Sequence, residues 1–198
     1  LEASCDGLLL LATEGGGESF SICNPTTRQY APLSLLRGFS LGGMYYYFKN
    51  KEDLLFLIQE KTFGSLLALQ EETVAAGGTA DERLQRLVKN HLAYFISHFN
   101  ELKVCTFELE SLQGERYENI AELRRRYYLC MARVVGEIHG LTAEQVDQDR
   151  QVRHRTLFIF GMLNWVFMWY DPEKDDPAGT LGDEMVAMVM NGLNGEGK

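Results

Sequence analysis

The sequence contains no apolar run long enough to cross a lipid bilayer. The longest candidate, residues 157–170, has 14 residues and includes Asn164, whereas a membrane-spanning helix needs about 20. A second run, from Leu8 to Ala12, is too short for the core of a secretory signal and lacks a basic flank. We therefore expect a soluble, cytoplasmic protein with no membrane partner, in which residues 157–170 form a buried helix.

Metal-binding and redox motifs are also missing. The four cysteines, at positions 5, 23, 105 and 130, form no Cys-x-x-Cys pair. His91 and His98 are seven residues apart, which is too far for the close pairing of a helical zinc site. The chain carries neither a nucleophile motif nor a phosphate-cradling glycine loop after a strand. We expect no metal, no cofactor, no enzyme activity and reduced cysteines.

Basic residues are scarce. Nineteen Lys and Arg stand against 28 Asp and Glu, for a net charge of −9, which argues against holding nucleic acid by bulk charge. The deficit is uneven, because residues 1–51 carry four bases and four acids and are neutral. A site that binds an anion is therefore expected early in the chain.

From Asn50 onward, the spacing of apolar residues and the stop signals predict an all-α fold. Thr79 with Glu82, and Thr142 with Gln145, match the capping box that opens a helix. Only residues before Leu33 look β-like. The predicted helices cover residues 51–76, 79–99, about 104–112, 115–138, 145–170 and 181–192.

The second half of the helix predicted at residues 145–170 is apolar on every side, so both of its flanks must be covered. The last helix repeats this pattern. Two such helices from each subunit would pack as a four-helix bundle, which predicts a homodimer; alternatively, other helices of a monomer cover both flanks. The expected interface residues are Leu157, Gly161, Met168, Leu181, Met185, Met188, Val189 and Gly192.

Residues 38–55 form the most specific stretch of the sequence. Ser40 can cap a very short helix, which Met44 and Phe48 would anchor in a core. Three tyrosines then precede Lys51, which falls in the first turn of the next helix. Tyrosine hydroxyls, lysines and a helix N-terminus together make a plausible phosphate clamp. The alternative is that the tyrosines are ordinary aromatics at the edge of a core.

The same stretch resembles the end of the helix-turn-helix of TetR-type transcriptional regulators, whose pattern is Gly-x-Ser-x-Gly-x-Leu-Tyr-Tyr-x-Phe-x-x-Lys-x-x-Leu. Met44 stands where that pattern has Leu, and the residues that match it are Gly38, Ser40, Gly42, Tyr45, Tyr46, Phe48, Lys51, Leu54 and Leu55. Residues 122–128 and 160–172 resemble the effector domains of TetR regulators of fatty-acid and steroid catabolism. The resemblance implies a ligand-responsive repressor whose dimer reads palindromic operator DNA. It makes residues 1–50 an atypical head and residues 51–198 the effector-binding and dimerisation domain. The implied DNA contacts are Ser40, Tyr45, Tyr46, Tyr47 and Lys51.

Residues 3–33 depart from the regulator pattern and resemble instead a propeller blade of the domain associated with plant F-box proteins. This segment is either foreign to the regulator or an accidental likeness, in which case Leu8–Thr13 could imitate the first helix of the head. If the first head helices are replaced, DNA binding is lost. The alternative function is then a dimeric small-molecule-binding or scaffolding protein.

Aromatic residues and methionines recur at helical spacing in the second part of the chain. They are either an ordinary core or the lining of an apolar cavity with a few polar tips. The resemblance implies a hydrophobic effector, such as an acyl-CoA, a fatty acid or a steroid-like molecule. The expected ligand-binding residues are Tyr94, His98, Phe107, Tyr127, Met131, Phe158, Met162 and Trp165.

Overall fold

The computed structural model describes residues 3–5, 8–13, 19–24, 29–33, 51–107 and 111–194, with the backbone alone for residues 3–33 and positions 51, 103, 107 and 194. The chain divides into two compact units. The first comprises Leu1–Gly64 and His98–Ala121, and the second comprises Ser65–Ser97 and Glu122–Lys198. No helix among the described residues is both long enough and apolar enough to cross a membrane.

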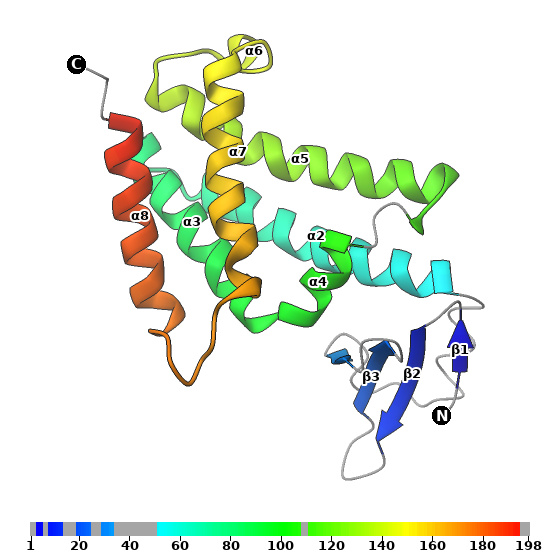
Figure 1. Cartoon of the computed structure of the whole chain (residues 1–198). Coiled ribbons are helices and arrows are strands. Elements are labelled where there is room, and N and C mark those ends of the chain that lie inside the picture. Colours follow the sequence, from blue (N-terminus) through cyan, green and yellow to red (C-terminus); the bar gives the residue numbers. More distant parts are fainter. Residues whose placement is uncertain are drawn as a thin grey trace. The chain divides into compact units, whose positions relative to one another are not determined.

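The first unit contains a four-stranded antiparallel sheet (Figure 1), with the strands β1 (Ala3–Cys5), β2 (Leu8–Thr13), β3 (Ser19–Asn24) and β4 (Gln29–Leu33) in chain order. Leu10 of β2 lies opposite Ile22 of β3. The β-like character before Leu33 is therefore confirmed, and the idea that Leu8–Thr13 imitates a helix is wrong. This six-residue segment is of ordinary length for a strand but far too short for a helix that relies on local interactions.

From Lys51 onward the regular secondary structure of the described residues is helical, which confirms the all-α class for the body of the protein. The expected short helix-turn-helix at residues 38–50 lies outside the described residues. The helices are α2 (Lys51–Ala75), α3 (Ala80–Ser97), α4 (Phe99–Phe107), α5 (Gly114–Ile138), α6 (Ala143–Val146), α7 (Arg150–Trp165), the 3-10 turn η3 (Val166–Met168) and α8 (Ala178–Asn194).

The single helix predicted at residues 145–170 is divided into three pieces. The capping box at Thr142 opens only the short α6. Asp149 then caps a new helix, α7, by accepting a hydrogen bond from the Val152 amide at 2.8 Å. An aspartate in extended conformation competes with helical hydrogen bonding and starts the next helix instead. The continuous periodicity of apolar residues hid this break.

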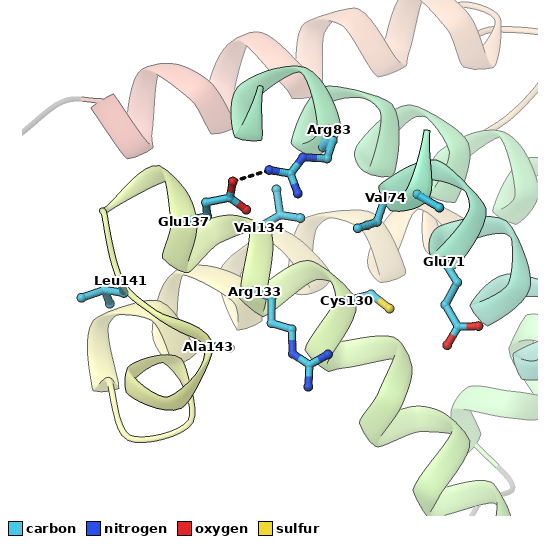
Figure 2. A pocket seen from close by; sticks show the side chains of 10 residues that line it. Glu71, Val74, Arg83, Cys130, Arg133, Val134, Glu137, Leu141 and Ala143 are labelled. Carbon is cyan, nitrogen blue, oxygen red and sulfur yellow. Dashed lines mark hydrogen bonds and ion pairs between the residues drawn. The ribbon is translucent and has the colours of Figure 1, made fainter. Parts of the chain in front are cut away.

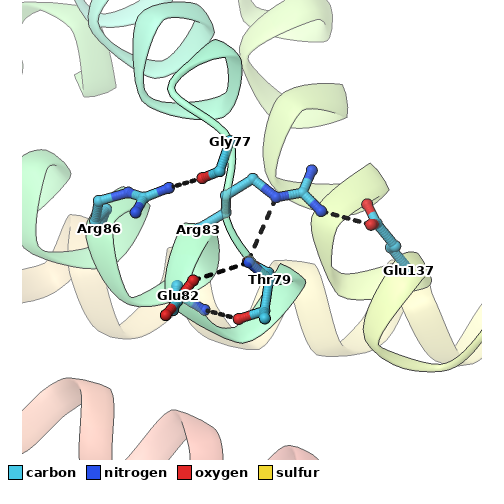
Figure 3. A network of polar contacts seen from close by, with 6 residues as sticks. All are labelled: Gly77, Thr79, Glu82, Arg83, Arg86 and Glu137. Carbon is cyan, nitrogen blue, oxygen red and sulfur yellow. Dashed lines mark hydrogen bonds and ion pairs between the residues drawn. The ribbon is translucent and has the colours of Figure 1, made fainter.

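The junction between α2 and α3 is fixed by two glycines and a capping box (Figure 3). Gly77 and Gly78 have φ angles of 74° and 97°, which L-residues with side chains avoid. The amide of Glu82 donates to the Thr79 hydroxyl at 3.2 Å, and the Thr79 amide donates to the Glu82 carboxylate at 2.9 Å. Arg86 donates to the Gly77 carbonyl. The predicted helix end and helix start are both confirmed.

Within the second unit, α3 and α8 lie side by side (Figure 1). Gly182 allows this approach, since a Cβ atom there would meet Lys89 Cγ at 3.3 Å and Leu92 Cδ2 at 3.8 Å. Lys89 also forms an ion pair with Asp183, the next residue of α8. The buried side of α8 therefore belongs to this protomer's own core.

Replacing Gly78 by Ala should destabilise the protein, because the φ of 97° is strained for alanine and the new Cβ would lie 2.6 Å from the Glu82 carboxylate. We expect the free energy of unfolding to fall by about 1–2 kcal/mol. Gly64→Ala is the control, since Gly64 is helical with nothing within 4 Å of its new Cβ, and should stabilise by roughly 0.5–1 kcal/mol. Urea unfolding of the full chain measures both; equal effects would contradict the prediction.

Candidate functional site

A buried polar pair occupies the middle of the second unit. His91 of α3 and Tyr127 of α5 are 0% and 6% exposed, and the tyrosine hydroxyl is hydrogen-bonded to Nδ1 of the imidazole. Phe95 stacks on the His91 ring with centroids 4.1 Å apart. Phe160 of α7 lies 5.2 Å from the Tyr127 ring. Three helices thus enclose one polar pair in aromatic surroundings.

Both members of the pair are uncharged at neutral pH. Burial lowers the pKa of His91 to about 3. The nearby side chain of Asn164 on α7 raises this pKa but offsets only part of the effect of burial. Burial raises the pKa of Tyr127 well above its ordinary value, and the nearby Cys130 adds to the rise. The pair therefore offers hydrogen bonds without charge, surrounded by apolar rings.

Two further polar side chains are buried in this unit without hydrogen-bond partners. Both amide atoms of Gln70 on α2 and the hydroxyl of Thr156 on α7 are in this state, and both residues are 0% exposed. Leaving such a group unsatisfied costs about 1–3 kcal/mol. Native cores rarely keep such groups without a water or a ligand to satisfy them.

A groove of about 540 Å³ lies on the surface of the same unit (Figure 2). Its apolar floor includes Val74 and Val134, and the Arg83–Glu137 ion pair lies along one side. Burial raises the pKa of the Cys130 thiol, so this cysteine stays protonated. The groove is lined by Glu71, Val74, Ala75, Arg83, Cys130, Arg133, Val134, Glu137, Leu141 and Ala143. No cluster of potential metal ligands occurs among the described residues.

The predicted ligand-binding residues separate into several groups. Tyr127 and Met131 are buried in the second unit, and Tyr94 and Met162 are half-buried there. His98 belongs to the first unit, and the Phe107 side chain lies outside the described residues. Phe158 and Trp165 are 69% and 56% exposed, so the placement of these two inside a cavity is corrected. They share the outer side of α7, whereas Thr156, Ile159, Phe160 and Leu163 face inward.

Sequence reasoning missed His91, Gln70 and Phe160 as members of the polar site. The available signal was the position of His91 on the apolar stripe of α3, which also carries Leu84, Leu87, Val88, Leu92 and Phe95. A histidine at that spacing is buried with its neighbours. Gln70 likewise continues the spacing of the buried residues Phe63, Leu66 and Leu67 of α2, which was a signal for its burial.

Large apolar side chains are also exposed on α7, η3 and α8. Of the predicted interface residues, Leu157, Gly161, Met168, Met188 and Gly192 are exposed and Leu181 is half-buried. Met185 and Val189 are instead buried in the protomer itself, since α8 packs against α3. The exposed large apolar residues of this surface are Leu157, Phe158, Trp165, Met168, Trp169 and Met188.

The predicted DNA contacts lie outside what the structure describes. Ser40, Tyr45, Tyr46 and Tyr47 precede the first described helix, and Lys51 is described by its backbone alone, at the start of α2.

The buried histidine predicts a pH-dependent stability. Below pH 6.5 His91 is protonated in the unfolded chain, whereas in the folded protein it stays neutral down to about pH 3. The free energy of unfolding should therefore decrease as the pH is lowered from 6.5 to about 3, by up to about 1.4 kcal/mol per pH unit from this group. Urea titrations should show a shallower pH slope for His91→Gln, whereas His154→Gln, at an exposed histidine, should keep the wild-type slope. An unaltered slope in His91→Gln would contradict the assignment.

Known proteins match most of this chain. The sequence profile described as "Tetracyclin repressor-like, C-terminal domain" matches residues 77–193. The Fatty acid metabolism regulator protein of Bacillus subtilis (strain 168) is 23% identical over 167 residues, which are 84% of this chain and 85% of that protein.

Two solved structures share the fold. A TetR-family transcriptional regulator from Bordetella parapertussis has a TM-score of 0.68 at 20% identity, with 81% of this chain and 83% of that one covered. AibR in complex with isovaleryl coenzyme A and operator DNA has a TM-score of 0.62 at 21% identity, with 74% and 78% covered. These matches do not support the likeness of residues 3–33 to a plant F-box propeller. The chain belongs to the tetracyclin repressor-like family of ligand-responsive transcriptional regulators.

Proposed function

We propose that this regulator is a cytoplasmic homodimer without enzyme activity that represses transcription from a palindromic operator and releases it on binding a hydrophobic small molecule. Residues 1–50 would form the head and residues 51–198 the effector-binding and dimerisation domain. The observation that carries the proposal is the uncharged His91–Tyr127 pair inside an aromatic core. An apolar enclosure with a few convergent polar groups is the usual form of a small-molecule site.

The effector is expected to be an acyl-CoA, a fatty acid or a steroid-like molecule. The Bacillus subtilis relative is named for fatty acid metabolism, and AibR was crystallised with isovaleryl coenzyme A. In this chain, the residues that remain candidates for its apolar part are Tyr94, Tyr127, Met131 and Met162, all in the second unit.

A second copy of the chain is the proposed cover for the exposed apolar surface of α7, η3 and α8. Phe158, Trp165 and Met188 are 69%, 56% and 66% exposed. Several large apolar side chains exposed in this way are expected where another protein binds. Gly161 supports close helix approach, since nothing lies within 4 Å of the place where its Cβ would be.

The effector would control DNA binding by binding more tightly to one of two conformations of the dimer. α2 begins at Lys51, the last of the predicted DNA contacts, and carries the groove residues Glu71 and Val74 in its second half. An effector that binds more tightly to one position of this helix would change the separation of the two heads. The dimer would then no longer fit its palindrome.

The strand β2 at Leu8–Thr13 favours a second candidate function. A regulator head of this family needs a supporting helix before its recognition helix, and this segment is a strand instead. The second candidate is therefore a dimeric small-molecule-binding or scaffolding protein that no longer binds DNA.

Charge on the exposed apolar surface should prevent dimer formation. Trp165→Glu would place a carboxylate on a surface that the second copy must cover, at a cost of several kcal/mol. Light scattering after size exclusion should give a dimer for the wild type and a monomer for this variant. Tyr117→Glu is the matched control, an aromatic residue 43% exposed on the first unit, and should remain dimeric. A monomeric wild type would reject the dimer.

DNA binding is tested by mobility shift of the full chain across a promoter library at low and moderate salt. Tyr45→Phe and Lys51→Ala should each weaken binding about three- to thirty-fold by removing one phosphate contact, without altering the melting temperature. Arg125→Ala, which removes an exposed base of α5, is the control. If the wild type retards no fragment at either salt concentration, the second candidate function replaces the first.

A further inference from the structure

An arginine holds the first turn of α2 against the beginning of α5. Arg116, the third residue of α5, forms an ion pair with Asp53, and its other terminal nitrogen lies 3.8 Å from the Glu52 carboxylate. Its guanidinium also lies over the Phe56 ring, 5.9 Å from the ring centroid. All four residues belong to the first unit. Arg116 therefore contacts two successive carboxylates and a side chain one turn further along the same helix.

The turn that precedes α5 adds a backbone contact at the same place. The amide of Gln113 donates a hydrogen bond to the Glu52 carboxylate at 3.3 Å. Leu112, just before it, is buried, and Gly114, just after it, has a φ of 54°, which other residues rarely adopt. This turn and the helix that follows it bring two donors, one from the backbone and one from Arg116, to the first turn of α2.

The two carboxylates lie beside a predicted DNA contact. Lys51 starts α2, and Glu52 and Asp53 follow it directly. Carboxylates in the first turn stabilise a helix, but they repel a DNA phosphate bound next to them. The distances involved are comparable to the screening length of about 8 Å at physiological salt. The start of α2 therefore has two acidic residues where DNA binding requires positive charge.

Arg116 offsets this negative charge. Together with Lys51, it balances the two carboxylates, whereas without it the same group of residues would carry one excess negative charge. The Asp53 side chain is only 15% exposed, compared with 37% for Glu52. Water and salt screen a charge in such surroundings less than a fully exposed one, so the pair of Arg116 with Asp53 is stronger than an ordinary surface ion pair.

We propose that Arg116 is a positioning residue for DNA binding, which neutralises Glu52 and Asp53 beside the phosphate contact at Lys51 and fixes the first turn of α2 against α5. This rests on the proposed function, in which Lys51 and the head bind operator DNA. Arg116 comes from a helix outside the head, and it acts through the two carboxylates rather than by touching DNA.

Mobility shifts of the full chain, on a fragment that the wild type retards, test the role of charge. Arg116→Gln should weaken binding about three- to tenfold at about 50 mM salt and less at about 200 mM, because salt screens the repulsion. A purely structural defect would give the same loss at both salt concentrations. Arg116→Lys keeps the positive charge and should bind within about twofold of the wild type.

Removing a carboxylate should restore the affinity. Asp53→Asn in the Arg116→Gln background should recover most of the loss, and Asp53→Asn alone should bind as tightly as the wild type or more tightly. Arg126→Gln is the matched control. It breaks the other printed ion pair between α5 and α2, in which Arg126 lies 2.6 Å from Glu71, about five turns beyond Asp53 on α2, and it should leave the affinity unchanged. Circular dichroism checks that each variant is folded.

Three results would overturn this inference while leaving the proposed function intact, because the wild type would still bind DNA. They are wild-type affinity of Arg116→Gln, an equal loss at both salt concentrations, and weaker binding by Asp53→Asn alone. If the wild type retards no fragment, the proposed repressor function fails, and this inference fails with it.

Discussion

The second unit is organised around one constraint, which is that a histidine and a tyrosine must satisfy each other inside an apolar core. His91 and Tyr127 come from α3 and α5, and Phe160 of α7 closes the aromatic shell around them. A hydrogen bond in such surroundings is worth more than in water, and each partner left alone would be correspondingly costly. The positions of three helices are therefore coupled at a single point.

The body of the fold could be read from the sequence where local chemistry is decisive. Gly77 and Gly78 end a helix because their backbone angles require glycine, and Thr79 with Glu82 starts the next one. The helix break at Asp149 could not be predicted, because the apolar periodicity continues on both sides of this capping residue and suggests one unbroken helix. The β character of residues 3–33 could be predicted from the sequence, whereas their likeness to a plant F-box propeller is not supported by the comparisons, since a short meander of strands is common to many folds.

The site was less predictable than the fold, for a geometric reason. The sequence shows which residues of α7 are apolar. It does not show whether an apolar side chain packs inside the protomer or faces a partner. Phe158 and Trp165 were assigned to a cavity and are exposed, whereas Met185 and Val189 were assigned to an interface and are buried. Only the packing of α8 against α3 decides between these sides. The polar members of the site depend on contacts between residues far apart in sequence, such as His91 and Tyr127.

The close contact at Gly182 gives the second unit a mechanical property. The missing side chain of Gly182 leaves room for Lys89 and Leu92 of α3, and the adjacent Asp183 is paired with Lys89. Helix α3 thus buries His91 in the interior and also packs against α8. Because packed helices leave few voids between them, a displacement of α3 is expected to move α8 as well. A shift of His91 in the interior would therefore reach the exposed apolar residues of α8 through the contact between α3 and α8.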